Sequence, residues 1–377
     1  MSELVVTNAL VVTAEDSFRG TICVKDGKIA ALDTGKSNLP GVWDADGDMV
    51  LPGLVELHTD NLERHVSPRP GVKWPGLAAL VSHDRQIAGA GITTVLDSLS
   101  MGFDLSREGR QVALQLAMDT LGTAKDEGLL KADHMLHLRC ELPAPTLLED
   151  VRRVIGHPLV RLASVMDHTP GQRQWRNLDK WRTFNSRRYN PEQMNEMIAV
   201  RQERQRLYVD DNRRALVPLF RERGLSVASH DDTTADHVRE AHEAGVTISE
   251  FPTTLEAARL AHGMGMKTVM GAPNLVMGGS HSGNVAALEL AREGVLNGFA
   301  SDYVPNSMIQ SAFMLHVEHG FPLHQTVGWV TSEPAAMVRL EDRGRIAEGL
   351  RADLVRVKLF RGTPVIRQVW LAGERVI

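Results

Sequence analysis

The sequence predicts an α/β protein in which a (β/α)8 TIM barrel carries a small β-sandwich formed by both chain termini. Three observations support this fold class. Between residues 51 and 339, eight short apolar runs alternate with helical patterns. Almost every run ends in a polar or ionisable residue, which is typical of the active-site face of a barrel. Both ends of the chain consist of short apolar runs and turns, as expected of strands.

The first barrel strand is predicted within residues 51–60, where apolar residues follow a turn at Pro52-Gly53. The other seven are predicted at residues 92–97, 134–141, 160–168, 225–231, 246–251, 267–271 and 298–302. Helical patterns lie between them, for example at residues 107–127, 192–223, 234–244 and 254–263. Residues 169–191, rich in Arg, Gln and Asn, are predicted to be an irregular insertion after the fourth strand.

The two ends of the chain are predicted to share one domain. Asp26-Gly27 lies between two apolar runs and is a hairpin signal, and residues 352–357 and 365–371 are predicted strands. Neither end has enough strands to form a stable sheet alone. We therefore predict a composite sandwich from residues 1–50 and 340–377, and a barrel from residues 51–339.

Composition excludes several classes of protein. A net charge of −5 argues against a general nucleic-acid or membrane partner, and no apolar segment is long enough to span a bilayer. The only cysteines, Cys23 and Cys140, predict no disulfide framework. We expect a cytoplasmic protein with a small-molecule substrate, and the sequence leaves open whether it forms a homodimer.

The strand ends suggest a metal site. His58 and Asp60 lie two residues apart on a strand and share a face, and an imidazole with a carboxylate suits a divalent metal. A core histidine beside a capping aspartate would give the same pattern. Later strands also end in polar groups, at Asp97, Glu141, Asp167-His168, His230-Asp231-Asp232, Glu250, Asn274 and Asp302. A single residue of this kind is commonly a helix cap, whereas a ring of them predicts a metal centre.

Longer motifs identify a family. The stretches LPGLVELHTDNLERHVSPRPGVKWP, SHDRQIAGAGITTVLDS, HLRCELP, SVMDHTPGQRQ, ASHDD, EFPTT, MGAPNLVMGGSHSGN and ASDYVP resemble the amidohydrolase superfamily of metal-dependent hydrolases. Over nearly the whole chain they are most similar to its diphosphatase branch in the carbon–phosphorus lyase pathway. This resemblance implies hydrolysis of alpha-D-ribose 1-methylphosphonate 5-triphosphate to the 5-phosphate and diphosphate.

The resemblance also implies a ligand set. We expect one or two divalent ions, zinc first and manganese or iron as alternatives, held by His58, Asp60, Glu141, His168, His230 and Asp302. Two such ions, roughly 3.5–4 Å apart, would need about that many ligands. Asp302 is expected to take the proton of the attacking water. His168 and His230 could instead pack behind the site, and Asp97, Asp167, Asp231 and Asp232 are expected to orient metal-bound histidines.

The chain departs from the common superfamily pattern in three places. Asp60 stands where a second histidine is usual, and Glu250 stands where another histidine is usual. The fourth strand, which ends Met166-Asp167-His168, has no lysine that could bridge two metals. Glu141 is our candidate for the bridging ligand.

An anionic ribose triphosphate needs cationic and N–H partners. The candidates are Arg69, Arg139, Arg173, Asn274, Ser280 and His281. Arg139 shares a strand face with Glu141. Ser280 and His281 belong to a glycine-rich loop, GGSHSGN, whose backbone could cradle an anion before a helix predicted to open at Val285. The same loop could serve only as a helix cap.

Two other functions remain open at this stage. The chain could hydrolyse a C–N bond of a cyclic amide or amine, which is the commoner activity of the superfamily. It could also be a barrel that lost its metals and serves as an assembly subunit. The cationic residues and the GGSHSGN loop favour phosphoanhydride hydrolysis over the first, and the metal-type residues argue against the second.

Overall fold

The barrel is a parallel eight-stranded sheet in the order β13-β12-β11-β10-β9-β8-β7-β6. This computed structural model describes residues 3–69, 71–102, 108–186, 188–280 and 283–377. The strands are β6 (Leu54–Thr59), β7 (Ile92–Met101), β8 (Asp133–Glu141), β9 (Val160–Met166), β10 (Ser226–His230), β11 (Ile248–Glu250), β12 (Lys267–Gly271) and β13 (Gly298–Ala300). A parallel bridge between Thr59 and Asp302 brings the two edges together. The predicted fold class is confirmed.

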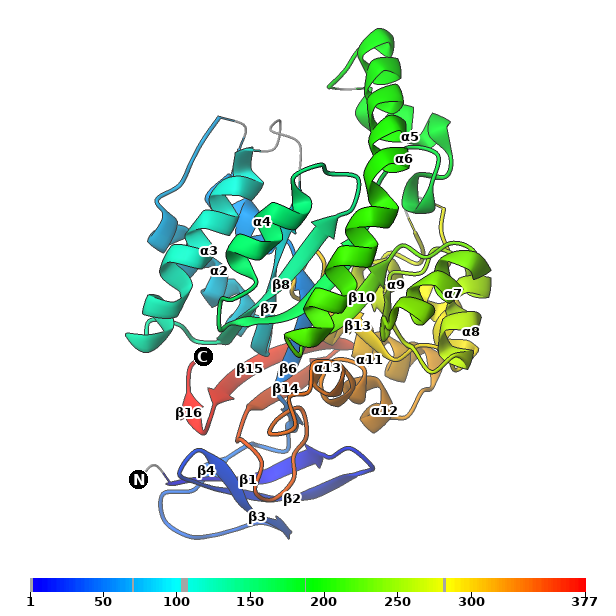
Figure 1. Cartoon of the computed structure of the whole chain (residues 1–377). Coiled ribbons are helices and arrows are strands. Elements are labelled where there is room, and N and C mark those ends of the chain that lie inside the picture. Colours follow the sequence, from blue (N-terminus) through cyan, green and yellow to red (C-terminus); the bar gives the residue numbers. More distant parts are fainter. Residues whose placement is uncertain (1–2, 70, 103–107, 187, 281–282) are drawn as a thin grey trace.

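Helices connect the strands and cover the outside of the barrel (Figure 1). They are α1 (Asn61–Val66), α2 (Gly76–Gly89), α3 (Glu108–Asp126), α4 (Leu147–Val154), α5 (Leu178–Asn185), α6 (Pro191–Glu222), α7 (Ala235–Ala244), α8 (Leu255–Gly263), α9 (Ala272–Val276), α10 (Ala287–Arg292), α11 (Ser307–His319), α12 (Leu323–Gly328) and α13 (Ser332–Met337). The predicted insertion holds a short 3-10 helix, η1 (Arg173–Trp175), and α5. Among the described residues, no helix is long and apolar enough to cross a membrane.

Strands from both termini form a second, mixed sheet in the order β16-β15-β14-β5-β1-β2-β3, with β4 paired to β1. Its strands are β1 (Glu3–Val12), β2 (Ser17–Lys25), β3 (Lys28–Thr34), β4 (Trp43–Asp44), β5 (Met49–Pro52), β14 (Leu354–Phe360), β15 (Thr363–Leu371) and β16 (Glu374–Arg375). The ends meet where β14 pairs antiparallel with β5. The exact division at residues 50 and 340 stays a prediction.

One glycine carries the chain from the terminal sheet into the barrel. Gly53 separates β5 from β6, and its N–H donates to the carbonyl of Asp353 at 2.8 Å. A Cβ atom at this position would lie 2.1 Å from Oγ1 of Thr93 on the neighbouring strand. Only glycine permits this close approach. The chain passes from β5 to β6 through this single residue without the predicted turn at Pro52-Gly53.

The barrel interior is closed beneath the site by apolar side chains. Each of the eight strands contributes to one buried cluster, through Val55, Leu57, Leu96, Met135, Leu162, Ala228, Ile248, Val269 and Ala300. Because this plug fills the interior, polar side chains that project inward gather beyond it, at the carboxyl ends of the strands.

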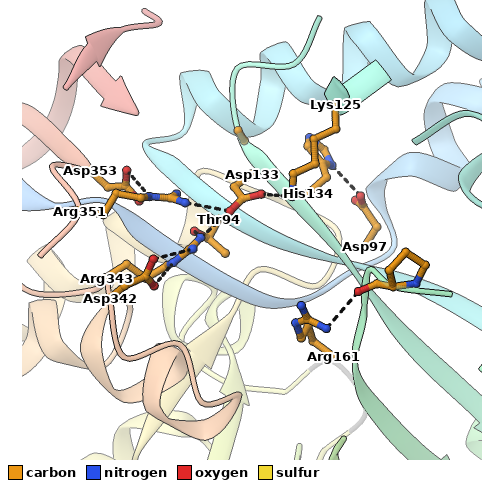
Figure 2. Close-up of polar contacts among 12 residues, drawn as sticks. Thr94, Asp97, Lys125, Asp133, His134, Arg161, Asp342, Arg343, Arg351 and Asp353 are labelled. Carbon is orange, nitrogen blue, oxygen red and sulfur yellow. Dashed lines mark hydrogen bonds and ion pairs between the residues drawn. The ribbon is translucent and has the colours of Figure 1, made fainter. Parts of the chain in front are cut away.

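A partly buried carboxylate, that of Asp133, joins the base of the barrel to the segment that leads into β14 (Figure 2). Asp133, the first residue of β8, accepts from Arg343 at 2.6 Å, from Arg351 at 2.9 Å and from Lys125 at 2.5 Å. Arg343 also donates to the hydroxyl of Thr94 on β7 at 3.0 Å. Burial alone would raise the pKa of Asp133, but these cations hold it well below its usual value.

Replacing Asp133 with asparagine should lower the free energy of unfolding by about 3 kcal/mol, because it leaves the buried Arg343 and the partly buried Arg351 without a full counter-charge. The midpoint of urea unfolding measures this loss. The matched control is Glu149→Gln, which removes an exposed pair with Arg153 and should change stability by less than about 1 kcal/mol. Equal midpoints for the two variants would contradict a structural role for Asp133.

Candidate active site

All six predicted metal-binding residues line one cavity of about 900 Å³ at the carboxyl ends of the barrel strands. They are His58, Asp60, Glu141, His168, His230 and Asp302. Residues up to 244 positions apart in sequence therefore meet, because each stands at or just beyond the end of a strand. The structure brings the predicted set together, and the roles of its members are argued below.

One group of potential ligands lies at the junction of the first and last barrel strands. Candidate ligand atoms of His58, Asp60 and Asp302 all lie within 4.8 Å of one another. Nε2 of His58 is 3.9 Å from Oδ1 of Asp60. Arg139, which is buried, forms an ion pair with the same carboxylate. Asp60 is therefore shared between a cation site and a guanidinium.

A second group lies across the cavity and consists of His168, His230 and Asp231. Oδ2 of Asp231 is 2.9 Å from Nδ1 of His230 and 3.5 Å from Nε2 of His168. Glu141, the predicted bridging ligand, instead holds His168: Oε2 lies 2.7 Å from Nδ1, and the backbone N–H of His168 donates to Oε1 at 2.8 Å. Glu141 thus orients His168, and it belongs to neither group of ligand atoms.

Glu250 connects the two groups. Its Oε1 lies 2.8 Å from Nδ1 of His58, and its Oε2 lies 3.7 Å from Nε2 of His230. From the sequence, Glu250 was one of the polar strand ends and a departure from a usual histidine, but it was not a predicted metal ligand. Its place at the end of β11 was the available signal, because the neighbouring strand β10 ends at His230, a candidate ligand. Asp231, predicted to orient a histidine, is likewise close enough to act as a ligand.

Five polar atoms of this floor form no hydrogen bond within the described part of the chain, although Oδ2 of Asp231 and Nδ1 of His230 lie in ion-pair contact at 2.9 Å. They are Nε2 of His58, both ring nitrogens of His230, Oδ2 of Asp231 and Oε2 of Glu250, all buried. Buried polar atoms nearly always form hydrogen bonds, so five atoms without one that converge from different strands require an explanation. Nitrogen and carboxylate donors in this arrangement fit divalent cations.

The backbone at the strand ends is strained. Asp231, Phe251 and Asp302, each following a barrel strand, have φ values of 57°, 56° and 55°. This left-handed conformation is uncommon for residues other than glycine, and for phenylalanine it is rare. Backbone hydrogen bonds between adjacent strands hold this conformation. The N–H of Asp231 donates to the carbonyl of Glu250, and the N–H of Asp302 donates to the carbonyl of His58, both at 2.9 Å. Such strain gathers at functional sites, where it aims side chains.

Electrostatics favour a cation in the cavity. Burial alone would lower the pKa of His168, but Glu141 and Asp231 outweigh burial and raise it to about 9. Burial alone would raise the pKa of Glu250, but His58 and neighbouring histidines lower it to about 2. Glu250 is therefore ionised at neutral pH, and Glu141 and Asp231 hold a proton on His168. A divalent cation that binds here takes the place of that proton.

The other predicted orienting aspartates face elsewhere. Asp97 lies between His83 at 2.6 Å and His134 at 2.7 Å, in the layer between the barrel and α2. Its side chain points outward because side chains alternate along β7. Asp167 accepts from Gln205 at 2.8 Å. Asp232 accepts from Ser249 and Arg173. Within the described part of the chain, no contact joins any of these three side chains to His58, His168 or His230, and Asp97 instead forms a separate buried cluster with His83 and His134.

The predicted substrate contacts divide into three sets. Arg139, Asn274 and Ser280 line the cavity. Asn274 also braces the glycine-rich loop, donating to the carbonyl of Val285 at 3.0 Å and accepting from the N–H of Ala287 at 2.9 Å. The helix after this loop begins at Ala287, two residues later than predicted, because residues 284–286 are extended over the cavity.

The other three predicted substrate contacts are Arg173, Arg69 and His281. Arg173 does not line the cavity: it is buried, and it donates to the carbonyl of His230 at 2.9 Å and to Asp232 at 2.8 Å, so it supports the end of β10. Arg69 is exposed and is also absent from the lining. His281 falls outside the described residues. The sequence did not indicate that Arg201 and Arg204, on α6, line the cavity.

Comparison with known proteins agrees with this geometry. An amidohydrolase family pattern matches residues 190–377. The chain is 41% identical to the alpha-D-ribose 1-methylphosphonate 5-triphosphate diphosphatase of Escherichia coli K12, over 99% of this chain and all of that protein.

Solved structures share the fold. A 5-methylcytosine deaminase from Klebsiella pneumoniae superimposes with a TM-score of 0.67 at 16% identity, covering 99% of this chain and 98% of that one. The N-acetylglucosamine-6-phosphate deacetylase of Pasteurella multocida gives 0.64 at 15% identity, covering 99% of both chains. The chain therefore belongs to the amidohydrolase family and, within it, to the family of the E. coli diphosphatase.

Proposed function

We propose that this chain hydrolyses alpha-D-ribose 1-methylphosphonate 5-triphosphate to the 5-phosphate and diphosphate. The observation that carries the proposal is one cavity whose floor and outer wall differ in chemistry. Its floor gathers histidines and carboxylates, and its outer wall carries arginines. A hydrolase of this family that acts on a neutral cyclic amide needs no arginine-rich wall, whereas a hydrolase that binds a polyanionic substrate does.

We assign the floor to one or two divalent ions, with zinc first and manganese or iron as alternatives. His58, Asp60, His168, His230 and Asp302 would hold them, with Asp231 and Glu250 as additional donors. Glu141 keeps His168 in its orientation. When bound, such an ion lowers the pKa of water to about 7 and so provides a nucleophile at neutral pH.

The protein's own residues position the reactants. Asp302 projects over the floor and accepts the proton of the attacking water. The water oxygen bonds to the phosphorus nearest the ribose, the bond from that phosphorus to the next bridging oxygen breaks, and diphosphate leaves with the electron pair. We assign substrate contacts to Arg139, Asn274 and Ser280, which line the cavity. Substitution at phosphorus of this kind depends on the positioning of the reactants and on stabilisation of the charge that develops.

Phosphorus NMR in oxygen-18 water tests the proposal. We expect the triphosphate signals to be replaced by those of a sugar 5-phosphate and diphosphate, with the label in the sugar 5-phosphate. Label in the diphosphate would place the attack at the second phosphorus and contradict the mechanism. Stable triphosphate together with hydrolysis of a cyclic amide would favour C–N chemistry, and purified protein without bound metal would favour a non-catalytic barrel.

A further inference from the structure

The outer wall of the cavity bears three arginines that form no ion pair with any carboxylate of the described residues. They are Arg188, just before α6, and Arg201 and Arg204 on α6. Other arginines of the same region do have acidic partners within three residues: Arg182 with Asp179, Arg206 with Glu203, Arg213 with Asp210 and Arg214 with Asp211. These four paired arginines do not line the cavity, whereas Arg188, Arg201 and Arg204 do.

Helical spacing explains which arginines line the cavity. Met197, Arg201 and Arg204 are four and three residues apart, so they lie on one face of α6, and all three line the cavity. Like charges at this spacing destabilise a helix by a few tenths of a kcal/mol. The arrangement is therefore unfavourable by itself and becomes favourable when an anion lies between the two guanidinium groups.

The wall is rigid enough to hold these side chains in place. α5 lies beside the first half of α6, which extends beyond the barrel (Figure 1). Trp181 of α5 packs in one buried cluster with Met194 and Ile198 of α6. Asn190 and Gln193 form reciprocal hydrogen bonds that fix the start of α6. Charged groups on packed helices bind with less loss of freedom than groups on loose loops.

Arg201 also faces the same space as the floor. It lines the cavity together with Glu141 and His168. A chain of phosphates whose first phosphorus reacts over the floor would therefore place its next phosphates beside Arg201. Arg204, three residues further along α6, lines the same cavity and can contact the same phosphates.

We propose that Arg188, Arg201 and Arg204 bind the two terminal phosphates of the substrate and hold the diphosphate as it leaves. The inference rests on the proposed function and identifies the part of the substrate that this wall recognises. As the phosphorus–oxygen bond breaks, its electron pair moves to diphosphate, and guanidinium groups stabilise the charge that develops there. The phosphonate end of the ribose then lies away from α6.

The test measures binding of each product to metal-loaded protein by calorimetry. Arg201→Met and Arg204→Met keep the length and helix propensity of the side chain but remove its charge. We expect each to weaken diphosphate binding about tenfold or more, and the double variant to weaken it further. Affinity for ribose 1-methylphosphonate 5-phosphate should stay close to that of the wild type. Arg206→Met, on the same helix but away from the cavity, should change neither affinity.

Two outcomes would overturn the inference. In one, diphosphate affinity is unchanged in the double variant; in the other, affinity for the sugar product falls and diphosphate binding stays intact. A melting temperature equal to that of the wild type shows that the variants fold, and the exposed Arg204 gives a single substitution with little structural risk. Failure of the wild type to hydrolyse the triphosphate would refute the proposed function separately, because product binding is measured without turnover.

Discussion

Replacing His230 with alanine is expected to remove bound metal and turnover together while the barrel stays folded. His230 belongs to the second group of ligands and lies close to the first, with its ring 5.6 Å from that of His58 and 5.4 Å from that of His168. Neither of its nitrogens forms a hydrogen bond within the described chain, although Nδ1 lies 2.9 Å from Oδ2 of Asp231. A cation held between the imidazole and the carboxylates of the floor accounts for the buried nitrogens.

The expected loss of turnover is large. Losing even an outer partner of a metal ligand typically costs about 10- to 100-fold in metal affinity or activity, so losing a ligand should cost more. Atomic emission measures metal per chain, phosphorus NMR measures turnover, and circular dichroism checks the fold. His262→Ala, an exposed histidine on α8, is the matched control and should keep both. Full metal content and full turnover in the His230 variant would rule out this assignment.

The fold could be predicted well because its signals are local. The predicted strand at residues 267–271 coincides with β12, and the helix predicted at 192–223 differs from α6 by one residue at each end. The strand predicted at 92–97 is longer in the structure, since β7 continues to Met101. Beyond Asp97 two serines alternate with Leu99 and Met101, and pairing with β8 as far as Cys140 extends the strand. That pairing is a tertiary effect that local sequence does not show.

The candidate site could be predicted only in part. Residues at strand ends were identified because barrel topology brings all such ends to one face. The direction of a side chain depends on register, and β6 is irregular in its pairing with β7 at two places, so the outward course of Asp97 could not be deduced. The arginines of α6 were missed for another reason. A helical pattern shows which residues share a face, but not that the first half of this helix lies over the cavity.

Replacing Asp302 with asparagine should reduce kcat by about a hundredfold or more, as expected when general-base help is removed, and should change KM much less. The backbone is held independently of the side chain: its N–H donates to His58, and its carbonyl accepts from the N–H of Asp60, both at 2.9 Å. Asparagine tolerates the left-handed conformation of this position. The substitution therefore keeps the shape of the strand end and removes the negative charge.

The chemical consequence follows from what each side chain can accept. A carboxylate takes the proton of the attacking water, whereas a neutral amide does so very poorly. Steady-state kinetics on the triphosphate, with metal content measured in parallel, separates a lost base from a lost ligand. Asp167→Asn is the matched control, since it changes an aspartate that also follows a barrel strand but contacts Gln205; its kcat should stay near the wild-type value. A wild-type kcat in the Asp302 variant would exclude Asp302 as the base.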